Sequence, residues 1–169
     1  CVTPMHYAEL HCKSNFSFLQ GASHASELVE RAKRLGYQAI AVTDRNTLAG
    51  IVRAHGAAKE EQLQFIVAAE LTFVDAPACV VWIPNRKSYG QLCQLLTLGR
   101  RRAEKGNCLL YFEDLKEYGD NWIVGVIPDW NAKSDNLTSD HLRLHEEAEL
   151  IETQQLLAYR ELFAEDCYL

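Results

Sequence analysis

Short apolar runs alternate along the chain with segments in which apolar residues recur every three or four positions. The runs indicate buried strands, and the spaced segments indicate amphipathic helices. We expect strands at residues 5–12, 37–44, 65–70, 78–83 and 122–128. We expect helices at residues 23–35, 46–59 and 87–101. In the first helix Ser23 is the predicted N-cap and Gly36 the predicted stop. Strands that alternate with helices favour an α/β fold with mostly parallel strands.

The remaining segments modify this pattern. Residues 71–74 and 78–83 flank Asp75-Ala76-Pro77, which predicts one β-hairpin. We expect loops at 14–22 and 129–140 and a strand or extended piece at 108–112. We also expect a helical turn at 113–118, a mostly helical region at 141–164 and the start of a strand at 167–169. Because the chain ends within this last element, we expect residues 1–169 to be a domain that is truncated on its C-terminal side.

The composition is that of a globular domain, with 48% hydrophobic and 24% charged residues. No apolar run reaches the about 18 residues of a membrane span, and the start of the chain lacks the pattern of a signal peptide. Six cysteines occur without a Cys-x-x-Cys pair, so neither a zinc ribbon nor a redox motif is expected. We therefore expect a reduced, cytoplasmic protein with no membrane partner, and we assign no role to Cys1.

The charge is unevenly distributed. The net charge is −6, and residues 140–169 account for it with eight Asp or Glu against two Arg or Lys. The rest of the chain is balanced, so no broad basic field is available to hold a phosphate backbone. The one basic cluster, RRRAEK at 100–105, follows a predicted helix. It has two interpretations, a solvated helix end that complements the helix dipole or a contact to phosphate.

Three polar side chains lie at the carboxyl ends of predicted strands, where the functional residues of parallel α/β folds are found. They are His11, Asp44 and Glu70, which together could hold Zn²⁺ or Mn²⁺ and activate water for phosphoester hydrolysis. Structural interpretations remain open for each residue. Asp44 could bind backbone amides of a turn, His11 could be a satisfied core histidine, and Glu70 could pair with Arg45 or Lys13.

Three sequence stretches, AELHCKSNFSFLQGASHASELVERAKRLGYQAIAVTDRNTLAGIVRAH, IVAAELTF and VVWIPNRKSYGQLCQLLTLGRRRAEKG, carry a specific family resemblance. They resemble the N-terminal PHP (polymerase and histidinol phosphatase) domain of bacterial C-family DNA polymerases. The ELHC, SNFSFL and GASH segments and VIPDW are most similar to the error-prone, DnaE-like branch. The resemblance spans roughly residues 7–169. It implies a partial PHP-type distorted (β/α)₇ barrel, with the palm, fingers and later polymerase domains absent from this chain.

The resemblance also implies a degenerate metal site. Lys13 and Arg45 stand where the family motifs have histidines, and Ala78 stands where a further histidine is expected. The family glutamate is kept as Glu70, and the later ligands lie beyond the chain. The implied PHP-site positions are His11, Lys13, Asp44, Arg45, Glu70 and Ala78.

These replacements suggest that a cluster of ion pairs has taken the place of the metal. A lysine ammonium has no free lone pair for a metal, and an arginine stays charged. Both can instead pair with carboxylates. We therefore hypothesise that Lys13 and Arg45 neutralise Asp44 and Glu70 directly.

The implied parent is an error-prone polymerase that acts in damage-induced mutagenesis and translesion synthesis, using Mg²⁺, template-primer DNA and dNTPs. Its partners would include the remainder of the polymerase chain and translesion accessory proteins. The fragment itself is expected to be a non-catalytic scaffold without a cofactor. The alternative is a metal-dependent phosphoesterase or 3′–5′ exonuclease that retains Zn²⁺ or Mn²⁺. A third interpretation is an interaction module that uses the acidic C-terminal helix and Trp130.

The other histidines carry weaker signals. His24 at the start of the first helix and His55 on the apolar face of the second are expected to pack. His141 and His145 lie four apart on one predicted helix, which is a possible metal-binding spacing, but no third ligand accompanies them.

Overall fold

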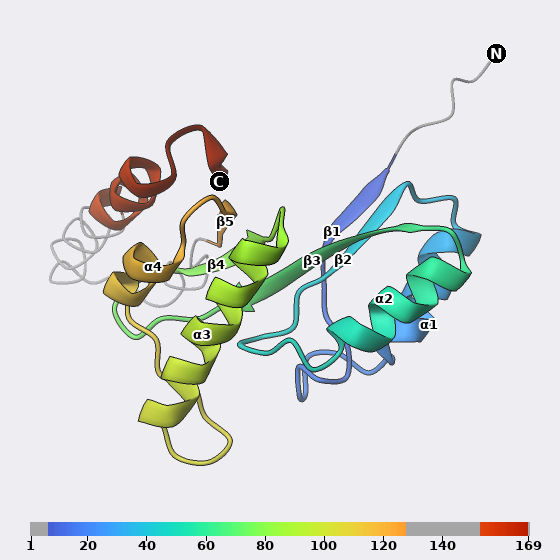
Figure 1. Ribbon diagram of the computed structural model, residues 1–169, viewed down its shortest axis with the longest axis horizontal. Helices are drawn as coiled ribbons and strands as arrows, with labels where there is room; N and C mark the ends of the chain where they lie inside the picture. Colours follow the sequence, from blue (N-terminus) through green and yellow to red (C-terminus); the bar gives the residue numbers. More distant parts are fainter. Residues whose placement is uncertain (1–6, 128–152, 169) are drawn as a thin grey trace, which may run out of the picture.

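The computed structural model describes residues 7–127 and 153–168, and these residues form a curled sheet with helices on its outer face (Figure 1). The strands lie side by side in chain order. They are β1 Ala8–Cys12, β2 Ala39–Val42, β3 Gln64–Leu71, β4 Ala78–Trp82, β5 Ile123–Ile127 and β6 Cys167–Tyr168. The helices are α1 Ala25–Arg34, α2 Ile51–Glu60, α3 Arg86–Arg102 and α4 Phe112–Tyr118, with a further helix at 153–163 and the 3₁₀ turn η2 Ala164–Asp166.

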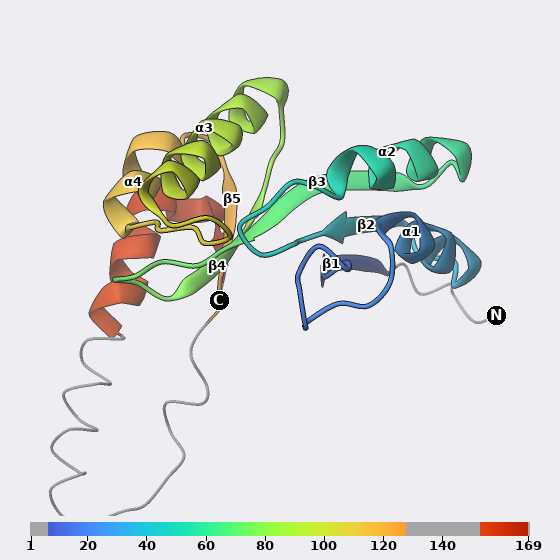
Figure 2. The ribbon, with the colours of Figure 1, turned by 90° about the horizontal axis from the view of Figure 1, so that it is seen from below.

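The first three strands are parallel because an amphipathic helix connects each to the next. Helices α1 and α2 lie next to each other over this part of the sheet (Figures 1 and 2). Val29 of α1 and Ala54 of α2 are fully buried against Ile40 and Val42 of β2. This first core fixes the carboxyl ends of β1, β2 and β3 at one edge of the sheet.

The last three strands form a second core with α3, α4 and the helix at 153–163 (Figure 2). β3 and β4 are antiparallel, β4 and β5 are antiparallel, and β5 and β6 are parallel. Trp122, Leu95 and Tyr159 are almost completely buried in this core. The Tyr159 hydroxyl donates to the carbonyl of Pro77 at 2.7 Å, which ties the C-terminal helix to the hairpin.

The sheet is curled, as a part of a barrel must be. β1 and β4 are separated by two strands in the sheet. Even so, the Trp82 Nε1 of β4 donates to the Leu10 carbonyl of β1 at 2.9 Å. This contact crosses the concave face, so the strands already enclose part of a barrel interior.

The α/β architecture and the hairpin are confirmed, but several boundaries were predicted wrongly. The first helix has His24 at its N-cap in place of Ser23, and the Glu27 carboxylate accepts from the His24 amide at 2.7 Å. The second helix begins at Ile51, because Asn46 has a left-handed φ of 52° and cannot start a helix there. The first hairpin strand is the end of β3, so residues 72–74 are not strand. For residues 108–112 the sequence allowed a strand or an extended piece, and residues 108–111 form no strand.

Some predictions lie outside the described residues. They include the loop at 129–140, the start of the C-terminal helical region, Trp130, His141 and His145. Within the described residues, no helix combines the length and the apolar character that crossing a membrane requires.

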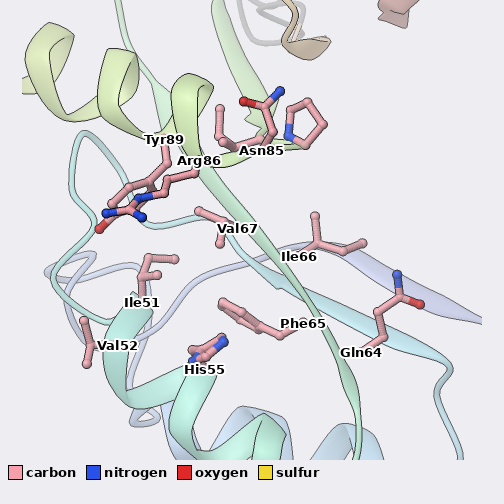
Figure 3. A pocket seen from close by; sticks show the side chains of 12 residues that line it. Ile51, Val52, His55, Gln64, Phe65, Ile66, Val67, Asn85, Arg86 and Tyr89 are labelled. Carbon is pink, nitrogen blue, oxygen red and sulfur yellow. The ribbon is translucent and has the colours of Figure 1, made fainter.

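The β3–β4 hairpin leaves an open groove on the outer face of the sheet. Because a turn and not a helix connects these strands, the outer face of β3 is uncovered between α2 and α3. The groove has a volume of about 620 Å³, and Figure 3 shows apolar side chains from both sides of it. Ile51, Phe65, Val67 and Tyr89 are among them. His55 lines this groove, and its ring packs edge-on against Phe65 as expected, although the residue is exposed.

The packing of α3 against the 108–110 segment provides a test of the fold. A Cβ added at the buried Gly99 would lie 2.6 Å from Leu110 Cδ2 and 2.7 Å from Cys108 Sγ. We predict that Gly99→Ala lowers the free energy of unfolding by about 1–3 kcal/mol, because overpacking outweighs the gain in helix propensity. Urea unfolding monitored by circular dichroism measures this change.

Gly90 in the same helix is the matched control. It is exposed, and an added Cβ would meet no atom within 4 Å. Gly90→Ala should therefore raise the free energy of unfolding by about 0.5–1 kcal/mol. Equal effects of the two substitutions would contradict the packing described for α3.

Candidate functional site

Glu70, near the end of β3, bonds to residues at the end of β1 across the carboxyl edge of the sheet. It is only 6% exposed. Its Oε2 lies 2.9 Å from His11 Nε2, and its Oε1 accepts from Lys13 Nζ at 2.8 Å. Lys13 also donates to Gln20 Oε1 at 2.8 Å. One carboxylate oxygen of Glu70 therefore binds a side chain of β1 and the other binds the first residue after β1.

The pKa of Glu70 reflects a competition between burial and these partners. Burial alone raises the pKa of this carboxyl group. The hydrogen bonds from His11 and Lys13 and the positive charge of Lys13 outweigh burial and bring the pKa below its ordinary value. Glu70 is thus ionised at neutral pH, and its charge is compensated within the protein.

Asp44 is paired in a different way. It is 2% exposed, and all three of its hydrogen-bond donors come from the loop after β1. Its Oδ1 accepts from the Ser14 amide at 2.8 Å and from the Ser17 hydroxyl at 2.7 Å. Its Oδ2 accepts from the Ser14 hydroxyl at 2.6 Å. Ser14 and Ser17 were not identified from the sequence as site residues, although both are buried polar side chains.

Two glycines permit this close approach of the loop to Asp44. A Cβ at Gly21 would lie 2.3 Å from the Ser14 carbonyl oxygen. A Cβ at Gly50 would lie 3.2 Å from Asp44 Oδ2 and 3.3 Å from Ser14 Oγ. The loop also closes on itself, because the Ser17 amide donates to the Ser14 carbonyl at 3.0 Å. The loop is therefore built to surround the aspartate with donors.

Arg45 does not have the contact that the sequence suggested. Its backbone bridges to Glu70, and its amide donates to Ser17 Oγ at 3.0 Å. Its side chain is exposed and forms no ion pair with any residue in the described part of the chain. The predicted pairing of Arg45 with Asp44 or Glu70 was therefore wrong, because hydroxyl and amide donors already satisfy Asp44.

Ala78 lies near this site but contributes no polar group. It is the first residue of β4, and its neighbour Cys79 pairs with Leu71, which follows Glu70. A side chain at position 78 is thus at the same edge of the sheet as Glu70.

The residues of this site do not fit a bound divalent metal. Across residues 7–127 and 153–168, no three side chains of His, Cys, Asp or Glu converge closely enough to hold one. The oxygens of Asp44 and Glu70 are engaged by protein donors, and an ammonium group lies within hydrogen-bonding distance of Glu70. A metal would have to displace these contacts and lie beside a cation.

The cysteine next to the site is also unsuited to nucleophilic chemistry. Burial raises the pKa of Cys12 to about 12, and the nearby carboxylates of Glu9 and Asp44 act in the same direction. Its thiol donates to the Ala41 carbonyl at 3.2 Å. Cys12 is therefore a packed thiol that helps join β1 to β2.

The sequence that forms this sheet and site matches a known protein family. The PHP domain matches residues 9–169. The chain belongs to the PHP domain family. The PHP positions inferred from the sequence lie within this match, and the structure brings His11, Lys13 and Glu70 into direct contact.

Two similar curated proteins are both named error-prone DNA polymerases. The chain is 42% identical over 168 residues to the error-prone DNA polymerase of Rhodopirellula baltica, and this match covers 99% of this chain and 14% of that protein. It is 53% identical over 123 residues to the error-prone DNA polymerase of Dechloromonas aromatica, and this match covers 73% of this chain and 12% of that protein. The chain therefore spans only about one seventh of the length of these relatives.

A solved structure matches the PHP fold. It is named as a metal-dependent phosphoesterase from Bifidobacterium adolescentis, with a TM-score of 0.59 and 15% sequence identity. The match covers 85% of this chain and 75% of that one. At this identity the likeness concerns the fold, and it agrees with a partial PHP barrel.

The ion pair between Lys13 and Glu70 gives a pH-dependent prediction. We predict that Lys13→Met lowers the free energy of unfolding at pH 7 by about 1–3 kcal/mol, because it leaves a buried carboxylate with one partner fewer. The Glu70 pKa is lowered in the folded protein, so its stabilisation is complete above the unfolded pKa of about 4.3 and is lost as the pH falls through the folded pKa. The difference in the free energy of unfolding between the wild type and Lys13→Met should therefore become smaller below about pH 4.

Urea unfolding of both proteins between pH 7 and pH 3 measures this deficit. Lys59→Met is the control, since Lys59 is exposed on α2 and should change the free energy of unfolding by less than about 0.5 kcal/mol. A deficit that is the same at every pH would contradict an ionic role for Lys13.

Proposed function

We propose that this chain is the PHP part of an error-prone DNA polymerase, in which it acts as a non-catalytic scaffold. The observation that carries this proposal is the engagement of Asp44 and Glu70 by protein donors. Lys13 and His11 hold Glu70, and the serines of the loop after β1 hold Asp44. The degenerate site thus stabilises the fold where a metal-dependent member of the family would place its catalytic ions.

The activity of the parent chain is part of the proposal. The identity to proteins named error-prone DNA polymerases supports a parent that copies damaged templates in translesion synthesis and DNA repair in the cytoplasm. Such a parent would use Mg²⁺, dNTPs and template-primer DNA at carboxylates outside this chain. Translesion accessory proteins would be its further partners.

The scaffold role has a surface available to it. The groove between α2 and α3 is apolar, and Val52 at its edge is 76% exposed. An apolar surface of this kind is normally covered by other protein. The remainder of the polymerase chain is the occupant that the proposal implies, since the relatives continue far beyond the matched part.

The second candidate is a metal-dependent phosphoesterase or 3′–5′ exonuclease. The likeness of the fold to a metal-dependent phosphoesterase favours it, and His11, Asp44 and Glu70 would be its Zn²⁺ or Mn²⁺ ligands. The side chain of His11 is 42% exposed, so its ring is accessible from solvent. The ammonium group of Lys13 beside Glu70 counts against this candidate.

The two candidates differ in their prediction for the isolated chain. We expect no Mn²⁺-dependent release of nitrophenol from bis(p-nitrophenyl) phosphate above the rate of a His11→Ala variant. A primer-template incubated with the chain, Mg²⁺ and dNTPs should show neither extension nor shortening of its 3′ end. Both rates are measured with the purified 169-residue chain.

Hydrolysis or 3′ shortening that is lost in His11→Ala would establish the second candidate and overturn the scaffold role. Primer extension by this chain alone would contradict the view that the polymerase carboxylates lie elsewhere. Activity that persists in His11→Ala would indicate a contaminating enzyme. The rate of this variant is then subtracted from the wild-type rate before the two candidates are compared.

A further inference from the structure

A second hollow of about 710 Å³ lies beside the PHP-derived site, and Arg45 is the one PHP-site position that lines it. It is enclosed by the loop after β1, the segments that follow β2 and β3, and the C-terminal end of α3 with the loop after it. None of His11, Lys13, Asp44 and Glu70 lines it. Arginines, small polar side chains and phenylalanines do, so its chemistry differs from that of the ion-paired site.

Two guanidinium groups from different elements face this hollow. Arg100, from the RRRAEK cluster, donates through Nη2 to the Asn46 carbonyl at 2.8 Å. Asn46 is itself held by Thr72, whose amide donates to its Oδ1 at 3.0 Å. Arg45 is exposed and has no ion-pair partner among the described residues. The guanidinium group of an arginine can bind two phosphate oxygens at once. Glu104 is the acidic residue in the lining.

The aromatic residues lie on the loop after β1. Phe16 and Phe18 line the hollow and are 39% and 81% exposed. The loop is fixed at its base, because the amides of Gln20 and Gly21 both donate to the Ser17 carbonyl. An exposed phenylalanine on an anchored loop provides a face on which a nucleobase can stack.

We propose that this hollow binds single-stranded DNA, with Arg45 and Arg100 on phosphates and Phe18 against a base. The combination of cations and an exposed aromatic ring matches the phosphates and bases of a single strand. Paired bases in a duplex keep their faces stacked, so the phenylalanine would gain little from a duplex. The balanced charge of residues 1–139 means that binding is local and not spread over a basic face.

The basic cluster is thereby divided between two roles. Arg102 pairs with Asp114 at 2.6 Å and supports the start of α4, whereas Arg100 faces the hollow. The proposal goes beyond the scaffold role and does not rest on it, since the side chains of Arg45, Arg100 and Phe18 take no part in the ion pairs of Glu70 or the hydrogen bonds to Asp44.

Fluorescence anisotropy of a labelled oligothymidylate with the 169-residue chain tests the proposal. Two phosphate contacts predict a log–log salt dependence with a slope of about −1.4 for a single strand. Arg45→Ala should weaken binding roughly fivefold and reduce the magnitude of the slope by about 0.7. Phe18→Ala should weaken binding at least about fivefold and leave the slope unchanged. An unlabelled duplex of the same length should compete poorly.

Arg53→Ala is the matched control, because Arg53 is exposed on α2 and does not line the hollow. Arg45 and Phe18 are surface residues, so melting temperatures by circular dichroism should match the wild type and exclude unfolding. No binding by the wild-type chain would overturn the proposal. Losses in Arg45→Ala and Phe18→Ala no greater than in Arg53→Ala, or equal competition by the duplex, would do the same.

Discussion

Two buried carboxylates at the carboxyl edge of the sheet constrain everything around them. Asp44 and Glu70 are both less than a tenth exposed, and a buried carboxylate is stable only when it is paired or accepts several hydrogen bonds. The segment after β1 satisfies both of them. Lys13 reaches Glu70, and Ser14 and Ser17 surround Asp44. The hydrogen bonds of this short segment therefore connect the carboxyl ends of β1, β2 and β3.

The hairpin after β3 explains why the domain has two cores. The α1 and α2 crossovers make β1, β2 and β3 parallel and cover them, whereas the turn between β3 and β4 reverses the chain without covering helix. β3 connects the cores, because Phe65 packs against the first and Val67 against the second. The apolar groove on its outer face is the consequence of this reversal.

The sequence was sufficient for those features that arise from local pattern. Apolar runs and helical spacing located β2, β3, β5, α1 and α3, and the Asp75-Ala76-Pro77 turn located the hairpin. The sequence left open whether Lys13 or Arg45 would pair with Glu70, and the structure shows the ion pair with Lys13.

Other features depend on backbone geometry that side-chain type does not reveal. Asn46 adopts a left-handed φ, which is incompatible with a helix at that position, and α2 begins only at Ile51. The side chain of Arg45, just before Asn46, is exposed. The donors to Asp44 come from a loop whose fold depends on contacts with Gly21 and Gly50. A serine-rich loop has no periodicity, so nothing in its sequence indicated which hydroxyls would turn inward.

The central claim is that protein donors have replaced the metal at this site, and metal content tests it most directly. The chain would be equilibrated with Mn²⁺, passed through a desalting column and analysed by inductively coupled plasma mass spectrometry, together with His11→Ala and Glu70→Gln variants. The account predicts much less than one ion per chain in the wild type and no difference between the three proteins. One tightly held ion per wild-type chain that is lost in both variants would contradict it.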